Sequence, residues 1–249
     1  MEIILPPKVN SYLDKIKEKT KKDIVFRPIG SSHLPPGIYA AFSPEGGNIN
    51  VFIVPTVLKE VDDDLYRAIV HEATHGLLVF DEGYYNIKPR DVELRINEEE
   101  KQIRNMLSTM IDDIVVNYKI QKEGFAPFGK NYLPQVKEEI KLINKGINPY
   151  KGECLRVGEI YCSKIKTFRY MTAWGFIKYF KLEDNILSLL KRYLTCFRNN
   201  FFEEYKECKK ITKLLNDYDI FSPKGHKIVC ERILKLWGLD KKMKMIKSL

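Results

Sequence analysis

The sequence contains no long hydrophobic run. No stretch approaches the roughly 18 consecutive apolar residues that a membrane-spanning helix needs, and the N-terminus, MEIILPPKVN, has only a short apolar run before two prolines. The pattern predicts neither a signal peptide nor membrane contact, so we expect a cytoplasmic protein. With 44% apolar and 30% charged residues, the composition is that of a chain that folds throughout, which excludes a disordered protein.

Cysteine is scarce, and its arrangement excludes the common cysteine-rich sites. The chain has five cysteines, an odd number, with no CxxC pair, and all lie in its second half: Cys154, Cys162, Cys196, Cys208 and Cys230. In a reducing compartment a disulfide framework is rare, and buried thiols behave as small apolar side chains. We therefore expect most of them to be core residues.

Acidic residues are scarce in the second half of the chain. Residues 1–125 carry 16 basic and 20 acidic side chains, whereas residues 126–249 carry 26 basic and 13 acidic ones. A basic half can attract nucleic acid or an acidic peptide, but lysine spread along amphipathic helices is more often a solvated face. We therefore do not expect a nucleic-acid partner, and take the charge as a weak indication of acidic substrates or partners.

Local patterns predict an α+β first half. A helix is expected over 7–22 and a strand over 24–29, and two further strands, GIYAAF (37–42) and NINVFIVP (48–55), are joined by the turn residues SPEGG in a hairpin pattern. Helical periodicity then covers 62–80 and about 93–122, with the loop DEGYYNIKPRD between them.

The second half is predicted to be almost wholly helical. Helices are expected over 134–146, 153–181, 184–198, 200–216 and 223–247, the last ending in the basic amphipathic tail LDKKMKMIKSL. The stretch KTFRYMTAWGFIKYFK mixes basic and aromatic residues, but its aromatic spacing is that of a central core helix. The change of pattern and charge at APFG (126–129) predicts two domains, an α+β domain 1–125 and a helical subdomain 126–249.

Histidine is rare, and two of the four histidines lie in one short motif. The chain has four histidines, two of which, His71 and His75, stand four apart in RAIVHEATHG. On a helix they share a face and can direct two imidazoles at one zinc ion. Glu72 lies about 100° round the helix, where its carboxylate can reach a water at the metal without occupying a ligand position. The alternative is a chance pair of histidines.

A catalytic zinc usually takes a third protein ligand. The motif does not continue as HxxGxxH, so this ligand must come from elsewhere, and the best candidate segment is MLSTMIDDIVVNYKIQKEG (106–124). Carboxylates within an apolar helix are costly unless paired or bound to metal. Asp113 has Asn117 one turn on, a residue that can hold a histidine N–H, whereas Asp112 has Val116 there. Asp113 is therefore the predicted third ligand and Asp112 the fallback; the alternative is that both face solvent.

These residues resemble the zincin metallopeptidases, in particular their gluzincin-like branch. The resemblance covers about residues 24–124: a hairpin, a helix with HEATH, and a second helix with an acidic residue and a polar residue four later. It implies a zincin-like sheet and active-site helix, one zinc ion, and a peptide or protein substrate that lies along the hairpin edge. In thermolysin-type members the acidic ligand is Glu, and the shorter Asp113 requires the two helices to approach more closely.

The resemblance leaves one role without a matching residue. Such enzymes stabilise the oxyanion of the transition state with a donor side chain, and no downstream residue matches it. The candidates are His226 in SPKGHKIV, Tyr84, Tyr85 and His33; a lone histidine such as His226 is more often exposed or a helix cap. A zinc metallopeptidase with Glu72 as base is therefore the first hypothesis. The rivals are a non-catalytic zincin-like regulatory or scaffold protein and a nucleic-acid-binding protein.

Overall fold

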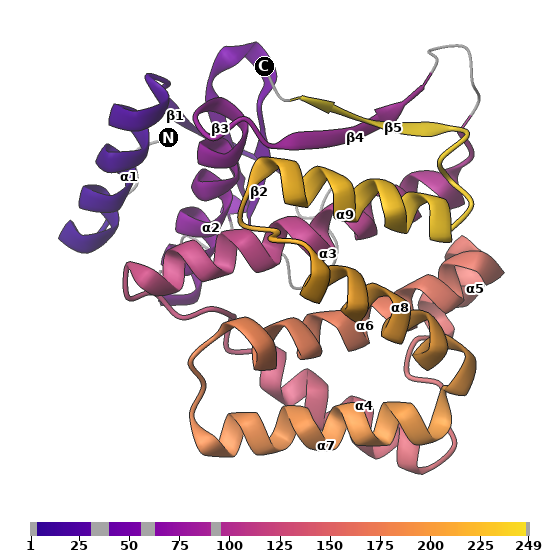
Figure 1. The fold of residues 1–249 in the computed structure, drawn as a ribbon. Coiled ribbons are helices and arrows are strands. Elements are labelled where there is room, and N and C mark those ends of the chain that lie inside the picture. The colour runs from indigo at the N-terminus through magenta and orange to yellow at the C-terminus, as the bar shows by residue number, and fades with distance from the viewer. Residues whose placement is uncertain (1–3, 31–39, 56–62, 91–95, 248–249) are drawn as a thin grey trace. The chain divides into compact units, whose positions relative to one another are not determined.

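The computed structural model describes residues 4–30, 40–55, 63–90 and 96–247 of the chain. The described part is mostly helical, with one three-stranded mixed sheet and one two-stranded sheet (Figure 1), so the expected α+β class is confirmed at that level. None of its helices is both long and apolar enough to cross a bilayer.

Contacts within the chain define two units. The first comprises Met1–Tyr84, Val116–Gly129 and Ser248–Leu249, and the second Tyr85–Val115 and Lys130–Lys247. The break at Gly129 lies at the expected APFG seam, but the units interleave along the chain because 85–115 belongs with the helical part. Whether 1–125 and 126–249 fold as separate domains stays a prediction.

A mixed sheet lies at the centre of the first unit. Its strands are β1 (Ile24–Pro28), β2 (Ala40–Ser43) and β3 (Ile49–Ile53), in the order β1-β3-β2. β2 and β3 are antiparallel and joined through η2 (Glu45–Gly47), which confirms the hairpin over its described residues, and β1 runs parallel to β3. Residues 37–39 of the expected strand lie outside the described part.

Two helices accompany this sheet in the first unit. α1 (Pro7–Thr20) and α2 (Asp63–Phe80) pack together, and α2 also contacts β2 and β3. The apolar stripe of α2 is buried because its members recur at helical spacing: Leu65, Ile69, Ala73 and Leu77. Between the helices, the hydroxyl of Tyr12 lies 3.1 Å from that of Thr74, which donates to Val70 O at 2.7 Å.

Gly76 sets how closely α2 approaches the sheet. A methyl group at this position would lie 2.6, 2.7 and 2.8 Å from three side-chain atoms of Ile49, a fully buried residue of β3. Such contacts are shorter than packed carbon atoms tolerate. The helix that carries His71 and His75 therefore rests on β3 at the one residue of that turn without a side chain.

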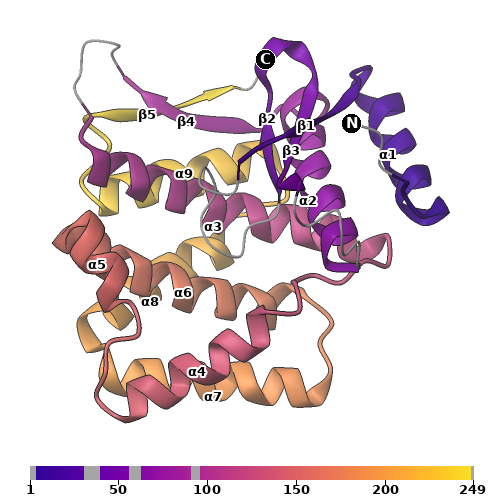
Figure 2. The same ribbon diagram turned by 180° about the vertical axis from the view of Figure 1, so that it is seen from behind.

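The second unit consists mainly of helices. After β4 (Tyr85–Pro89) come the first part of α3 (Glu98–Lys122), α4 (Tyr132–Asn144), α5 (Lys151–Val157), α6 (Glu159–Tyr179), α7 (Asp184–Asn200), α8 (Phe202–Asp217), α9 (Pro223–Leu236) and β5 (Met243–Lys247). α4 packs on α7, α6 contacts α5, α7 and α8, and α9 contacts β4 and β5 (Figure 2).

α6 is the expected core helix. It buries Tyr161, Tyr170, Met171 and Phe176, and its basic side chains pair with acidic residues of neighbouring helices. Lys164 bonds Glu207 at 2.5 Å, Lys166 bonds Glu204 at 2.7 Å, and Arg169 pairs with Glu139. These three basic side chains of α6 are thereby paired inside the fold.

Three predictions of secondary structure are wrong. The helix over 223–247 ends at Leu236, because Gly238 has φ +70° and turns the chain, and residues 243–247 form β5. In that tail Met243 and Met245 are buried and alternate with lysines, which is the period of a strand. Its antiparallel partner is β4, so the loop predicted at DEGYYNIKPRD is also wrong. The helix over 153–181 is divided at Gly158.

The cysteines divide into three core residues and one bonded pair. Cys196, Cys208 and Cys230 are buried free thiols, as expected for most of the set. Cys154 and Cys162 form a disulfide, contrary to expectation, because the break at Gly158 folds α5 back on the start of α6 and brings their Cα atoms to 4.7 Å.

Thiol counting tests this pairing. Protein purified without reductant and alkylated after unfolding should carry three labels by mass spectrometry, and five after reduction. A Cys154→Ser variant should carry four under both conditions, since Cys162 then has no partner. Five labels on unreduced wild-type protein would contradict the disulfide.

Substitution of Gly76 tests the packing of α2. Gly76→Ala should lower the free energy of unfolding by about 1–2 kcal/mol, because the cost of overpacking against Ile49 exceeds the gain in helix propensity. Gly152→Ala is the matched control, since a methyl group at this helical glycine of α5 meets no atom within 4 Å. Gly152→Ala should leave the free energy of unfolding unchanged or raise it. Urea titrations of both variants and of the wild type measure these changes. Equal effects of the two substitutions would show that Gly76 is not a contact point.

Candidate metal centre

α2 brings the two histidines of the HEATH motif together. The spacing of four places His71 and His75 on one face, and their Nε2 atoms lie 3.2 Å apart. His71 is buried, with 8% of its surface exposed, and His75 is half-buried. The ring of Phe42 from β2 stacks on His75 with 6.1 Å between centroids and 12° between planes. α2 thus carries both imidazoles, and the sheet contacts that of His75.

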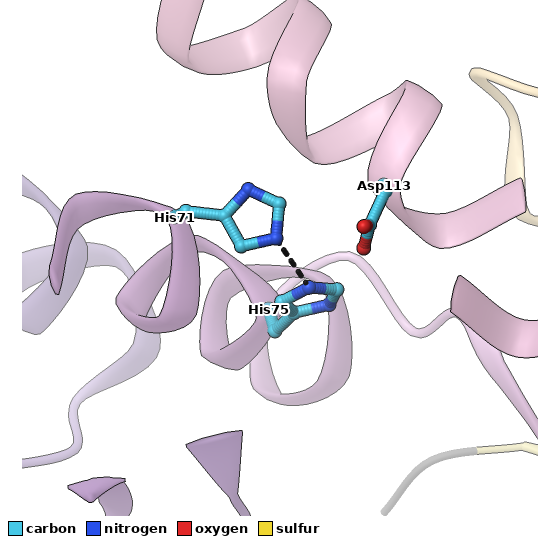
Figure 3. A group of neighbouring side chains, drawn as sticks. All are labelled: His71, His75 and Asp113. Atoms are coloured by element: carbon cyan, nitrogen blue, oxygen red, sulfur yellow. Dashed lines mark hydrogen bonds between the residues drawn. The ribbon is translucent and has the colours of Figure 1, made fainter. Parts of the chain in front are cut away.

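α3 supplies the acidic member of the group. It is one continuous helix, and one turn after Asp113 it carries Asn117, whose Oδ1 lies 2.9 Å from His71 Nδ1. That contact places the helix beside the histidines. Ligand atoms of His71, His75 and Asp113 all lie within 4.8 Å of one another, and Figure 3 shows the three side chains directed toward one point.

Asn117 also determines which nitrogen of His71 faces this point. An amide oxygen accepts hydrogen bonds, so its partner Nδ1 must carry the proton. The Nε2 atom of the neutral ring then presents a lone pair toward His75 and Asp113. The polar residue four positions after the acidic one therefore has the supporting contact that its spacing predicts.

The donor set fits a divalent transition metal. Two imidazole nitrogens and one carboxylate are a common ligand set of catalytic zinc, which keeps its fourth position open. Donor atoms at about 2.0–2.1 Å from a tetrahedral zinc lie roughly 3.4 Å from one another, and the two Nε2 atoms are 3.2 Å apart. The group of His71, His75 and Asp113 could therefore hold a metal ion, whose identity the donor set alone does not determine.

Asp112 contacts other residues than the metal group. Its Oδ1 lies 2.6 Å from His226 Nε2 on α9, and its Oδ2 accepts a hydrogen bond of 2.6 Å from Ser108. Asp113, the first choice, is in the metal group, and Asp112, the fallback, is not. The alternative in which both carboxylates simply face solvent is wrong, because the Asp112 side chain is only 17% exposed.

His226 is a buried residue and not an exposed or capping one. Its side chain is 1% exposed, and the N-cap of α9 is Ser222, which accepts from Gly225 N. Burial by itself would lower the pKa of His226, but the neighbouring Cys230 and the hydrogen bond to Asp112 raise it well above its ordinary value. Since its Nε2 is engaged by Asp112, the expected role as transition-state donor stays a prediction without support.

The remaining site candidates lie in different environments. Tyr84 is buried, with 3% of its surface exposed, and Tyr85 is half-buried in β4, with the Lys227 ammonium 5.4 Å from its ring centroid. His33 lies outside the described residues. Glu72 follows His71 on α2 and is half-buried. Its role as base stays a prediction.

Sequence reasoning missed the contact of Asp112 with Ser108 and His226. Ser108 stands one helical turn before Asp112, so testing the preceding turn as well as the following one would have found a partner. The contact with His226 joins residues 114 positions apart, and no local pattern indicates it.

Comparison with known proteins adds no assignment, since no family model, curated protein or solved structure matches this chain.

Metal uptake tests this group of ligands. Metal-free protein dialysed against zinc and washed should retain about one ion per chain, and His71→Ala or Asp113→Asn should weaken binding at least about 100-fold in competition with a chelator, because each removes a donor atom. Asn117→Ala should weaken it about 10–100-fold through loss of the support to His71.

Asp112→Asn is the matched control for Asp113→Asn, because the two residues are neighbours on one helix and only Asp113 belongs to the metal group. Its zinc affinity should stay within about threefold of wild type. A loss as large as that of Asp113→Asn, in protein whose circular dichroism is unchanged, would reassign the third ligand.

Proposed function

We propose that the protein is a zinc-dependent metallopeptidase that hydrolyses peptide bonds with a water activated by Glu72. The observation that carries the proposal is the convergence of His71, His75 and Asp113, with Asn117 holding His71. Glu72 directly follows the first histidine in the sequence, in the motif position that supplies a general base.

Each residue has a defined part in this proposal. His71, His75 and Asp113 would hold the ion, and Asn117 keeps His71 in the tautomer that can bind it. When bound, zinc would polarise the scissile carbonyl and lower the pKa of a water molecule toward about 7. Glu72 would take a proton from the attacking water and deliver it to the leaving amine.

β2 offers a place for the substrate. It is an edge strand of the described sheet, and its Phe42 contacts His75, so the edge runs beside the candidate metal centre. An extended peptide can add to such an edge through main-chain hydrogen bonds, which align the scissile bond with little demand on side chains. The proposed substrate is therefore a peptide or an unfolded segment of a protein.

A second candidate is a non-catalytic protein that keeps the metal group for folding or partner binding. It is favoured by one observation: the best candidate for the transition-state donor, His226, has its Nε2 engaged by Asp112. On this alternative the protein binds zinc and hydrolyses nothing.

Glu72→Gln separates the two functions. On the proposed function, this variant should bind zinc as the wild type does and should lose hydrolysis of a pool of internally quenched peptides by about 10²–10⁴-fold, because an amide cannot accept the proton. Glu18→Gln is the matched control, since Glu18 is exposed on α1, and it should keep full activity.

Two outcomes contradict the peptidase proposal. One is hydrolysis that persists in zinc-loaded Glu72→Gln at the wild-type rate. The other is a zinc-loaded wild type that cleaves no member of the pool, which would leave the non-catalytic alternative.

A further inference from the structure

Three basic residues of α6 are paired with acidic residues, whereas four basic residues of α8 and α9 have no such partner in the described part of the chain. Lys164, Lys166 and Arg169 of α6 pair with glutamates inside the fold. Two lysines of α8, Lys210 and Lys213, have no ion pair with any described residue, and the same holds for two basic residues of α9, Arg232 and Lys235. These four exposed side chains lie together at one place on the second unit.

That place is a groove between the two helices. It has a volume of about 460 Å³ and is lined by all four basic residues, by Leu214 and Leu236, and by Asp217 at the end of α8. Both leucines are half-buried, whereas all the charged residues are exposed. The groove therefore combines an apolar floor with a cationic rim.

Both helices build the groove from the same local pattern. α8 contributes KITKL (210–214) and α9 contributes RILKL (232–236), so each places two cations three positions apart and a leucine directly after the second. Positions three and four apart share a helix face, and three residues advance about 4.5 Å along the axis. The cations of each helix are thus spread along the groove and do not converge on one point.

The rim is held in an arrangement that favours negative charge. The Arg232 guanidinium lies over the ring of Tyr218, 4.7 Å from its centroid, which limits the positions that this side chain explores. Four like charges around one groove repel one another, and one carboxylate, Asp217, offsets part of that repulsion. An anionic ligand would offset the remaining repulsion among the four cations.

We propose that this groove binds an acidic segment of a partner protein, in which carboxylates flank an apolar side chain. The apolar residue would lie on Leu214 and Leu236, and the flanking carboxylates would meet the cations of α8 and α9. A single small anion would leave the leucines uncovered and could reach only some of the spread cations. This inference does not depend on the proposed peptidase function.

Nucleic acid fits the same groove less well. Binding of a single strand rests on aromatic rings on which bases stack, and the lining contains none. The ring of Tyr218 is covered by the Arg232 guanidinium. The two leucines on the floor of the groove cannot form hydrogen bonds or ion pairs with a phosphate backbone. They can make apolar contacts with a leucine or phenylalanine side chain of a peptide.

Fluorescence anisotropy with defined peptides tests the proposal. The probe is a labelled twelve-residue peptide in which pairs of glutamate alternate with leucine or phenylalanine, and it should bind with an affinity that falls as salt is raised. A version with glutamine for every glutamate, and one with serine for every apolar residue, should each bind at least tenfold more weakly. These two arms test charge and apolar contact without altering the protein.

Protein variants then locate the site. The double variant Lys213→Glu/Arg232→Glu should weaken binding of the acidic probe at least tenfold. The control Lys137→Glu/Lys191→Glu changes net charge equally at exposed positions of α4 and α7 outside the groove lining, and should change affinity less than twofold. Both variants should keep the wild-type thermal midpoint, because all four residues are exposed.

Several outcomes would overturn the proposal: no binding of the acidic probe, equal binding of the glutamine version, or equal weakening by the control variant. Tighter binding of a single-stranded oligonucleotide, lost in the same double variant, would assign the groove to nucleic acid instead.

Discussion

The hydrogen bond between His71 and Asn117 is the contact on which the candidate metal centre depends. It fixes the tautomer of His71 and, because α3 is one continuous helix, it also fixes where Asp113 lies one turn earlier. It is the hydrogen bond that ties a histidine of α2 to α3, and a pair of histidines without a ligand from a second element is a poor zinc ligand set. A single side-chain contact therefore couples the local geometry of one helix to the ligand supplied by another.

Three polar residues within six positions of α3 make different contacts. Asp113 joins the metal group, Asn117 supports His71, and Asp112 binds Ser108 and the buried His226. Carboxylates in an apolar helix are costly, so each has to be paired or bound. The neighbouring aspartates point about 100° apart around the helix, which is why one can face a metal while the other forms an ion pair with α9.

The same rule on buried charge governs the helical unit. Glu139 is 5% exposed and is satisfied by Arg169 and by the Tyr150 hydroxyl, which donates to its Oε2 at 2.8 Å. The pKa of Tyr150 is raised by burial, with the charge of Glu139 adding to the effect, so its hydroxyl stays a donor. Pairs of this kind engage Lys164, Lys166 and Arg169 of α6, whereas the four basic residues that line the groove of α8 and α9 meet solvent.

Local signals were sufficient to predict the hairpin at SPEGG, the helix bearing HEATH, and the choice of Asp113 over Asp112 from the residue one turn on. The spacing of residues along a helix sets the relative directions of these side chains without reference to the rest of the chain. Contacts between distant segments were needed to show that the basic tail is a strand, that His226 is buried against Asp112, and that Cys154 bonds Cys162. Each of these depends on a partner elsewhere in the fold: β4 for the tail, α3 for His226, and the break at Gly158 for the cysteines. A strand needs hydrogen bonds from another strand, and a buried charge needs a counterion, so neither can be read from the segment that contains it.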